Sequence, residues 1–210
     1  MPRGAVVLSG RSASRAASVR NAVDIPMSGG VTGRFITFTG LARGAEHFAI
    51  QFGAIDRQHP VLVRMHSECI TGDLFGSLRC DCGAQLSRSV EMLQEHGGIL
   101  LYLRQEGRGI GLVAKLDAYT LQDQGMDTFA ANRALSLPED ARDYGCGADM
   151  LHAMGIQRVR LITNNPDKLE QLAGHGIEIV DRVSSGTHLT RFNADYLRAK
   201  VDVSGHRLML

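Results

Sequence analysis

Three of the four cysteines fall in one polar stretch, and their spacing constrains the fold more than any other feature of the chain. Ten residues separate Cys69 from the C-x-C pair formed by Cys80 and Cys82. The fold must bring these two arms together if the thiolates bind one ion. Soft sulfur ligands in tetrahedral geometry indicate zinc, or less favourably an iron–sulfur cluster. Three ligands leave one position open, as in catalytic zinc sites, unless His66 completes a closed Cys3His shell.

Two other uses of these cysteines are less consistent with their surroundings. Free cysteines are common in hydrophobic cores, but Arg79 and Asp81 make this stretch too polar for simple packing. Disulfides are disfavoured, because four cysteines in 210 residues suit a reducing compartment such as the cytoplasm. The remaining Cys146 is interpreted as a packed thiol.

Composition excludes several classes of partner. The formal net charge is +1, which provides no overall attraction to nucleic acids or membranes. Tryptophan is absent and aromatic residues make up 5% of the chain, which argues against a stacking surface for single-stranded nucleic acid. No apolar run reaches the ~20 residues needed to cross a bilayer. We expect a cytoplasmic protein that binds neither nucleic acid nor membranes.

The chain divides into a basic start, one domain and a short end. Residues 1–24 contain four arginines and no acid before Asp24, a composition shared by organelle transit peptides and disordered basic tails, and we favour the disordered tail. Residues 25–200 are predicted to form a single domain, and residues 201–210 a C-terminal tail.

The periodicity within this domain predicts an α/β fold, in which helices flank a mixed β-sheet that has an antiparallel N-terminal portion. Alternating apolar residues predict three strands in an antiparallel meander, and the third leads directly to His66 and Cys69. Continuous apolar runs predict further strands buried on both faces. Residues 126–143 show no clear period. The predicted strands cover residues 35–38, 48–52, 61–65, 99–103, 159–162 and 177–180, and the predicted helices cover 82–96, 112–124, 144–154, 166–173 and 194–200.

A glycine-rich segment follows the predicted strand at 99–103. Its glycines at 107, 109 and 111 match neither a P-loop nor a dinucleotide-binding fingerprint. The segment is either a backbone that approaches a ligand closely, flanked by Arg104, Glu106 and Arg108, or a solvated charged turn.

Other polar residues have simple structural interpretations when each is taken alone. The helix start at Asn165–Pro166 could bind an anion with Lys168, but an ordinary cap is the favoured interpretation when this start is taken alone. Tyr119 fits the apolar face of its helix as a core tyrosine. Asp140 and Arg142 would form a surface pair of little energetic value.

Taken together, seven motifs over about residues 60–183 resemble those of GTP cyclohydrolase II. They are RMHSEC, ITGD, SLRCDCG, RQEGRGIGL, AYTLQDQGMDT, RDYG and TNNPDK. This family opens the imidazole ring of GTP and releases formate and pyrophosphate. The product is 2,5-diamino-6-ribosylamino-4(3H)-pyrimidinone 5′-phosphate, in the first step of riboflavin biosynthesis. The resemblance further implies one Zn2+ per subunit, Mg2+ with the triphosphate, and a homodimer.

The resemblance also implies roles for individual residues. The zinc ligands would be Cys69, Cys80 and Cys82, with water in the fourth position. Asp140 would accept a proton, Arg142 would act as nucleophile toward the α-phosphate, and Tyr119 would assist hydrolysis. An arginine stays protonated, so electrostatic stabilisation by Arg142 is the simpler physical account. The implied GTP contacts are Arg64, Met65, His66, Ser67, Glu68, Gln85, Glu106, Gly107, Arg108, Thr128, Thr163 and Lys168.

Two alternative functions remain at this point. An enzyme with the same site could stop at the formamidopyrimidine nucleotide, after one hydrolysis instead of two. The presence of Tyr119 argues against that alternative. A zinc-ribbon-like nucleic-acid-binding module would instead have a closed four-ligand site and a basic face, which the near-neutral charge opposes.

Overall fold

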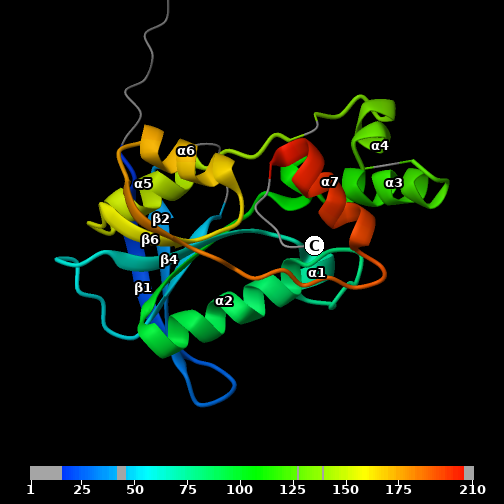
Figure 1. Ribbon diagram of the computed structural model, residues 1–210. Coiled ribbons are helices and arrows are strands. Elements are labelled where there is room, and N and C mark those ends of the chain that lie inside the picture. Colours follow the sequence, from blue (N-terminus) through cyan, green and yellow to red (C-terminus); the bar gives the residue numbers. More distant parts are fainter. Residues whose placement is uncertain (1–15, 42–45, 127, 139, 206–210) are drawn as a thin grey trace, which may run out of the picture.

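The computed structural model describes residues 16–41, 46–126, 128–138 and 140–205, which form one mixed seven-stranded sheet with helices around it (Figure 1). The strands are β1 (Ser18–Pro26), β2 (Thr32–Thr39), β3 (Phe48–Phe52), β4 (Val61–Ser67), β5 (Gly98–Leu103), β6 (Arg158–Ile162) and β7 (Glu178–Val183). The helices are α1 (Ile70–Asp73), α2 (Cys82–His96), α3 (Leu112–Asp123), α4 (Thr128–Ala134), α5 (Gly145–Ala153), α6 (Pro166–Gly174) and α7 (Ala194–Ser204), with a short 3-10 turn, η2 (Glu106–Gly109).

The sheet is antiparallel in its N-terminal half and parallel in the other half. The strand order is β1-β2-β3-β5-β4-β6-β7. Strands β1, β2, β3 and β5 pair antiparallel, whereas β5, β4, β6 and β7 pair parallel. This arrangement confirms the predicted α/β class with a mixed sheet and an antiparallel N-terminal portion.

Strand β4 corrects the predicted meander. It does not pair with β3 but lies between β5 and β6, parallel to both. Six of its seven residues are buried, which requires cover on both faces of the sheet. The α2 helix makes this possible, because it connects the parallel strands β4 and β5 and packs against the sheet.

The core has two layers, one on each face of the sheet. Leu62, Leu100 and Leu93 of α2 belong to one buried cluster. Val63 and Leu101 face the other way and pack in a cluster with residues of α5 and α6. In Figure 1, α2 accordingly lies along one side of the sheet, while α5 and α6 cover the other. Each fully buried aliphatic side chain contributes roughly 1.5–3 kcal/mol relative to exposure.

The predicted tail boundaries are wrong in part. Residues 18–24, predicted as disordered, belong to edge strand β1, which pairs with β2 although almost all of its side chains are exposed. Backbone hydrogen bonding stabilises such an edge strand, and composition does not report it. The rest of the predicted tail, residues 1–15, lies outside the described residues. At the other end, α7 continues past residue 200 to Ser204. Helix α4 also lies in the segment 126–143, for which the sequence predicted no regular structure.

Three parallel strands end at one edge of the sheet, and this edge positions the site. The cysteine loop follows β4, the η2 turn follows β5, and the α6 N-terminus follows β6. Ligands of open α/β sheets bind beyond the carboxyl ends of the strands. Helices α1, α3 and α7 gather beside this edge (Figure 1).

Candidate active site

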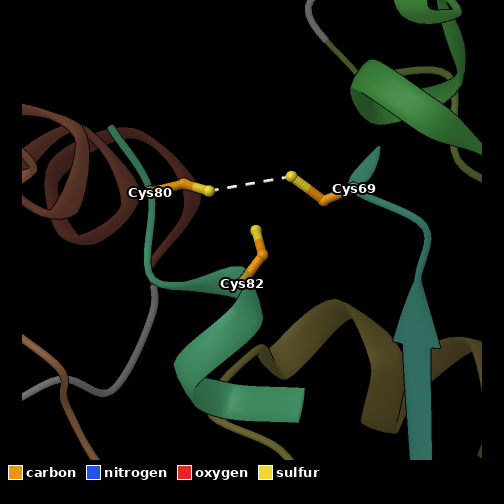
Figure 2. A group of neighbouring side chains, drawn as sticks. All are labelled: Cys69, Cys80 and Cys82. Atoms are coloured by element: carbon orange, nitrogen blue, oxygen red, sulfur yellow. Dashed lines mark hydrogen bonds between the residues drawn. The ribbon is translucent and has the colours of Figure 1, made fainter. Parts of the chain in front are cut away.

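The three cysteine sulfurs converge on one point, as their spacing predicted. Cys69 follows β4, Cys80 lies in the next turn and Cys82 begins α2. Their Sγ atoms all lie within 4.8 Å of one another, and the Cys69 and Cys80 sulfurs are 3.6 Å apart. Figure 2 shows the three side chains pointing toward a common centre.

The sulfurs share their protons unequally. Hydrogen bonds from Cys80 and Cys82 stabilise the Cys69 thiolate and lower its pKa far below the ordinary range, and the charge of Lys115 acts in the same direction. The bond to this thiolate raises the pKa of Cys80 to about 11. Two thiols here stabilise one thiolate, whereas a bound soft dication would stabilise all three sulfurs as thiolates. The residues therefore fit a zinc ion.

Among the described residues, no carboxylate or imidazole joins the three sulfurs. The candidate fourth ligand, His66, is fully buried, and its Nε2 lies 3.0 Å from the Asp73 carboxylate. The closed Cys3His shell is therefore not formed. Within the described part of the chain, the three sulfurs are therefore the whole protein donor set of this cluster.

Asp73 orders the first arm of the cluster. It accepts hydrogen bonds from the Cys69 backbone N–H at 3.0 Å and from the Tyr102 hydroxyl at 2.8 Å, in addition to its contact with His66. Burial lowers the pKa of His66, which favours a neutral ring. The ring then carries its proton on Nε2 and donates it in a hydrogen bond to the Asp73 carboxylate. The His66 Nδ1 is then a buried acceptor without a partner among the described residues.

A second buried group supports the same cysteine from the other side. Lys115 of α3 places its Nζ 3.2 Å from the Cys69 sulfur and 2.9 Å from the Glu106 carboxylate. Glu106 also accepts a hydrogen bond from the Ile70 backbone N–H at 2.6 Å. The carboxylate that the resemblance assigned to GTP is thus occupied by protein donors in this structure.

The cluster forms part of the wall of a cleft. Tyr119 is half-buried here rather than packed in the core. The charged groups of Lys115 and Arg79 lie 5.7 Å and 4.9 Å from the centroid of its ring. Burial raises the pKa of Tyr119, so its hydroxyl keeps its proton near neutral pH. The predicted residues that line this cleft beside the cysteines are Ser67, Glu68, Glu106, Gly107, Arg108, Tyr119 and Arg142.

A second pocket adjoins the cleft and is strongly cationic. The two share Ser67, Cys82, Arg142 and Tyr196. No carboxylate lines the second pocket among the described residues. The residues predicted to contact GTP that line it are Arg64, His66, Ser67, Gln85, Thr163 and Lys168.

Lys168 illustrates the excess of positive charge. Its Nζ donates to the Met65 carbonyl at 2.7 Å, an uncharged partner. Burial, together with the charges of Arg64 and Arg142, lowers the pKa of Lys168 well below its ordinary value. An anion in the pocket would relieve this repulsion. The Asn165 cap also forms as predicted, because its side chain accepts from the Asp167 N–H at 3.0 Å.

Arg142 is more buried than the predicted surface pair implies, with 15% of its side chain exposed against 36% for Asp140. Its guanidinium donates to both Asp140 carboxylate oxygens, with Nε at 2.8 Å and 3.1 Å. Burial opposes the charge on Arg142, but these hydrogen bonds outweigh it and raise the pKa of Arg142 above its ordinary value. The same bonds lower the pKa of Asp140 against the effect of burial. Both groups are held in their charged forms.

One predicted contact, Met65, does not line either pocket with its side chain. The Met65 side chain is fully buried in the core, and only its carbonyl reaches the site, where Lys168 binds it. Thr128 is the first residue of α4, and its side chain lies outside the described part of the structure.

Four polar residues of the site were missed by the sequence reasoning. Asp81, between two of the cysteines, is fully buried and accepts from Lys200 at 2.6 Å. Tyr196 lines both pockets, and Lys115 supports Cys69. The chain has only three lysines, at 115, 168 and 200, and this scarcity is the sequence feature that could have pointed to Lys115 and Lys200.

None of the described helices combines the length and apolar character that crossing a bilayer requires.

Comparison with known proteins agrees with this geometry. The family model for GTP cyclohydrolase II matches residues 18–184. The GTP cyclohydrolase-2 of Vibrio parahaemolyticus is 49% identical over 195 residues, covering 91% of this chain and 98% of that protein. That of Vibrio cholerae is 48% identical, covering 92% and 100%. The riboflavin biosynthesis protein RibBA of Synechocystis is 51% identical, covering 84% of this chain and 32% of that protein. The chain is therefore an enzyme that belongs to the GTP cyclohydrolase II family.

Proposed function

We propose that the chain is a zinc-dependent hydrolase that opens the imidazole ring of GTP. It releases formate and pyrophosphate and yields 2,5-diamino-6-ribosylamino-4(3H)-pyrimidinone 5′-phosphate, the first step of riboflavin biosynthesis. One observation carries this proposal: a cluster of three sulfurs opens into a cleft that continues into a cationic pocket, and no described residue adds a fourth ligand to the cluster or a carboxylate to the pocket wall.

Cys69, Cys80 and Cys82 would hold the zinc. A bound zinc supplies a water molecule of lowered pKa for attack at the imidazole carbon. Three thiolates cancel much of the ion's charge, so a neighbouring proton donor gains importance. Tyr119 suits this role, because it lines the same cleft and keeps its proton.

The cationic pocket would bind the triphosphate, which carries Mg2+. Lys168 and Arg142 provide positive charge where pyrophosphate leaves, and charge neutralisation of this kind accelerates phosphoryl transfer. The ion pair with Asp140 keeps Arg142 protonated, so its role is electrostatic and not nucleophilic. Asp140 would hold Arg142 in place and accept a proton only once that pair is broken.

The other assigned residues would orient the nucleotide. Gln85 and Thr163 offer hydrogen bonds from the pocket wall, and the unpartnered Nδ1 of His66 is a further acceptor. The loop from Glu106 to Arg108 borders the cleft, with Glu106 acting through Lys115. We further propose a cytoplasmic homodimer with one zinc per subunit that binds neither nucleic acid nor membranes.

The two alternatives differ in their products. An enzyme that stops at the formamidopyrimidine nucleotide would release pyrophosphate without formate. A nucleic-acid-binding module would release neither. The open metal position argues against the module, and Tyr119 argues for complete hydrolysis.

The test uses purified zinc-loaded protein incubated with GTP and Mg2+, with formate, pyrophosphate and the pyrimidine product quantified. We expect all three in equal amounts. Cys80→Ser should lose zinc and formate release together, with the metal content measured on the same sample. Tyr119→Phe should keep its zinc and accumulate the formylated intermediate. Formate release by metal-free Cys80→Ser would refute the zinc assignment.

A further inference from the structure

Every lysine of this chain is buried beside the site. Lys115, Lys168 and Lys200 are exposed by only 9%, 6% and 9%. Lysine is almost never buried unless it is paired, and here every other positively charged side chain of the sequence is an arginine. Lys115 supports Cys69, and Lys168 belongs to the family's TNNPDK motif. Lys200 lies beyond the segment that the family model matches and is not explained by either role.

Lys200 reaches the site from the C-terminal helix α7. Its Nζ lies 2.6 Å from Asp81, and it lines the cationic pocket with Arg64, Arg142 and Lys168. Tyr196, one turn earlier in α7, has its ring centroid 4.5 Å from the same Nζ.

Asp81 accepts hydrogen bonds from a second side chain as well as from Lys200. Its second oxygen accepts a hydrogen bond from Gln85, which itself accepts from Arg64 at 2.8 Å. Asp81 pairs with Lys200 and Asp140 pairs with Arg142, so two carboxylates serve a pocket with four cations. An ammonium has three N–H groups, and among the described residues Asp81 is the one hydrogen-bond acceptor for Lys200.

We propose that Lys200 is a phosphate-binding residue of this site, and that α7 completes the pocket for the polyphosphate. The proposal rests on the proposed function and deepens it, because it assigns the C-terminal helix to recognition of the triphosphate. Lys200 keeps its contact with Asp81 and directs its remaining N–H groups to phosphate oxygens. Through Asp81 it also connects the bound polyphosphate to the turn that carries Cys80 and Cys82.

A structural role predicts different behaviour. If Lys200 only neutralises Asp81, the single variant Lys200→Met suffers from an unpaired buried carboxylate, and the double variant Asp81→Asn/Lys200→Met recovers. If Lys200 binds phosphate, the double variant stays defective. Arg88→Met, which removes one exposed cation from α2, controls for net charge.

The measurement is calorimetric binding of inorganic pyrophosphate, together with KM and kcat for GTP. We expect Lys200→Met and the double variant to bind pyrophosphate about 10-fold or more weakly, and Arg88→Met to bind as the unaltered protein does. KM for GTP should rise by a similar factor, with a smaller change in kcat. Unchanged pyrophosphate binding in Lys200→Met, or restored binding in the double variant, would overturn the proposal.

Acetylation of the unaltered protein provides a test that does not depend on variant folding. Mass spectrometry can follow each of the three lysines separately. Pyrophosphate should slow acetylation at Lys200 while leaving Lys115 unaffected, and equal rates at Lys200 with and without pyrophosphate would contradict the proposal. Failure of the proposed function would give a different result from failure of the Lys200 proposal. In that case pyrophosphate would bind and protect Lys200, but GTP would not be turned over.

Discussion

Replacing Lys115 by methionine isolates the buried ion pair that supports the cysteine cluster. The Lys115 and Glu106 side chains are 10% and 6% exposed, and their charged atoms are 2.9 Å apart. Methionine retains most of the length of lysine but removes the charge. The Glu106 carboxylate then keeps only its backbone donors, Ile70 N–H and Gly107 N–H, and loses its counter-charge.

The expected cost is large for one substitution. Removing one partner of a buried ion pair destabilises a protein by about 3–5 kcal/mol, because the other charge stays buried and uncompensated. A domain of this kind has a total stability of about 5–15 kcal/mol, so the variant should fold with a clearly lowered midpoint. The double variant Lys115→Met/Glu106→Gln removes both charges and should recover most of the loss.

Urea unfolding followed by circular dichroism gives the free energies. The protein is kept reduced and metal-free, so that metal binding does not contribute. The surface variant Arg88→Met should stay within about 0.5 kcal/mol of the unaltered protein. A loss below about 1 kcal/mol in Lys115→Met, or a double variant no more stable than the single one, would refute the reasoning.

Three further predictions concern groups away from this pair. Burial and the charge of Arg104 lower the pKa of His47 below 6.5, so its stabilising contribution is present above that pH and is lost as the pH falls through the lowered pKa. One such group changes the free energy of unfolding by at most about 1.4 kcal/mol per pH unit. Urea unfolding at pH 7.5 and 5.5 should therefore show that His47→Gln loses less stability on acidification than the unaltered protein does. Burial raises the pKa of Cys146 to about 12, so iodoacetamide at pH 8 should alkylate it far more slowly in the native protein than in urea. A Cβ at Gly83 would lie 2.3 Å from the Gly72 carbonyl oxygen, so Gly83→Ala should cost about 1–3 kcal/mol and lower the zinc content, and normal values of both would contradict that contact.

Local patterns predicted most of the elements correctly. The apolar face after Cys82 and the glycine at 97 predicted α2, and Pro166 after the Asn165 cap predicted the start of α6. The C-x-C pair predicted a sulfur cluster that the fold does assemble. These signals succeed because each depends on residues close together in the chain.

Strand order and pairing were not determined by such signals. The alternating apolar residues of β4, Val61, Val63 and Met65, indicate a strand but do not report which strands lie beside it. The exposed residues of β1 report even less, since its pairing with β2 uses backbone groups.

The sequence by itself determined the family, the fold class, the three cysteines of the cluster and most residues of the two pockets, because these depend on composition and on motifs of short spacing. Only the tertiary structure decided the partners of the buried charges. It placed Lys115 against Cys69 and Glu106, and it brought Lys200 of α7 to Asp81. Partners of a buried charge are selected by desolvation across distant segments, and no local pattern encodes that selection.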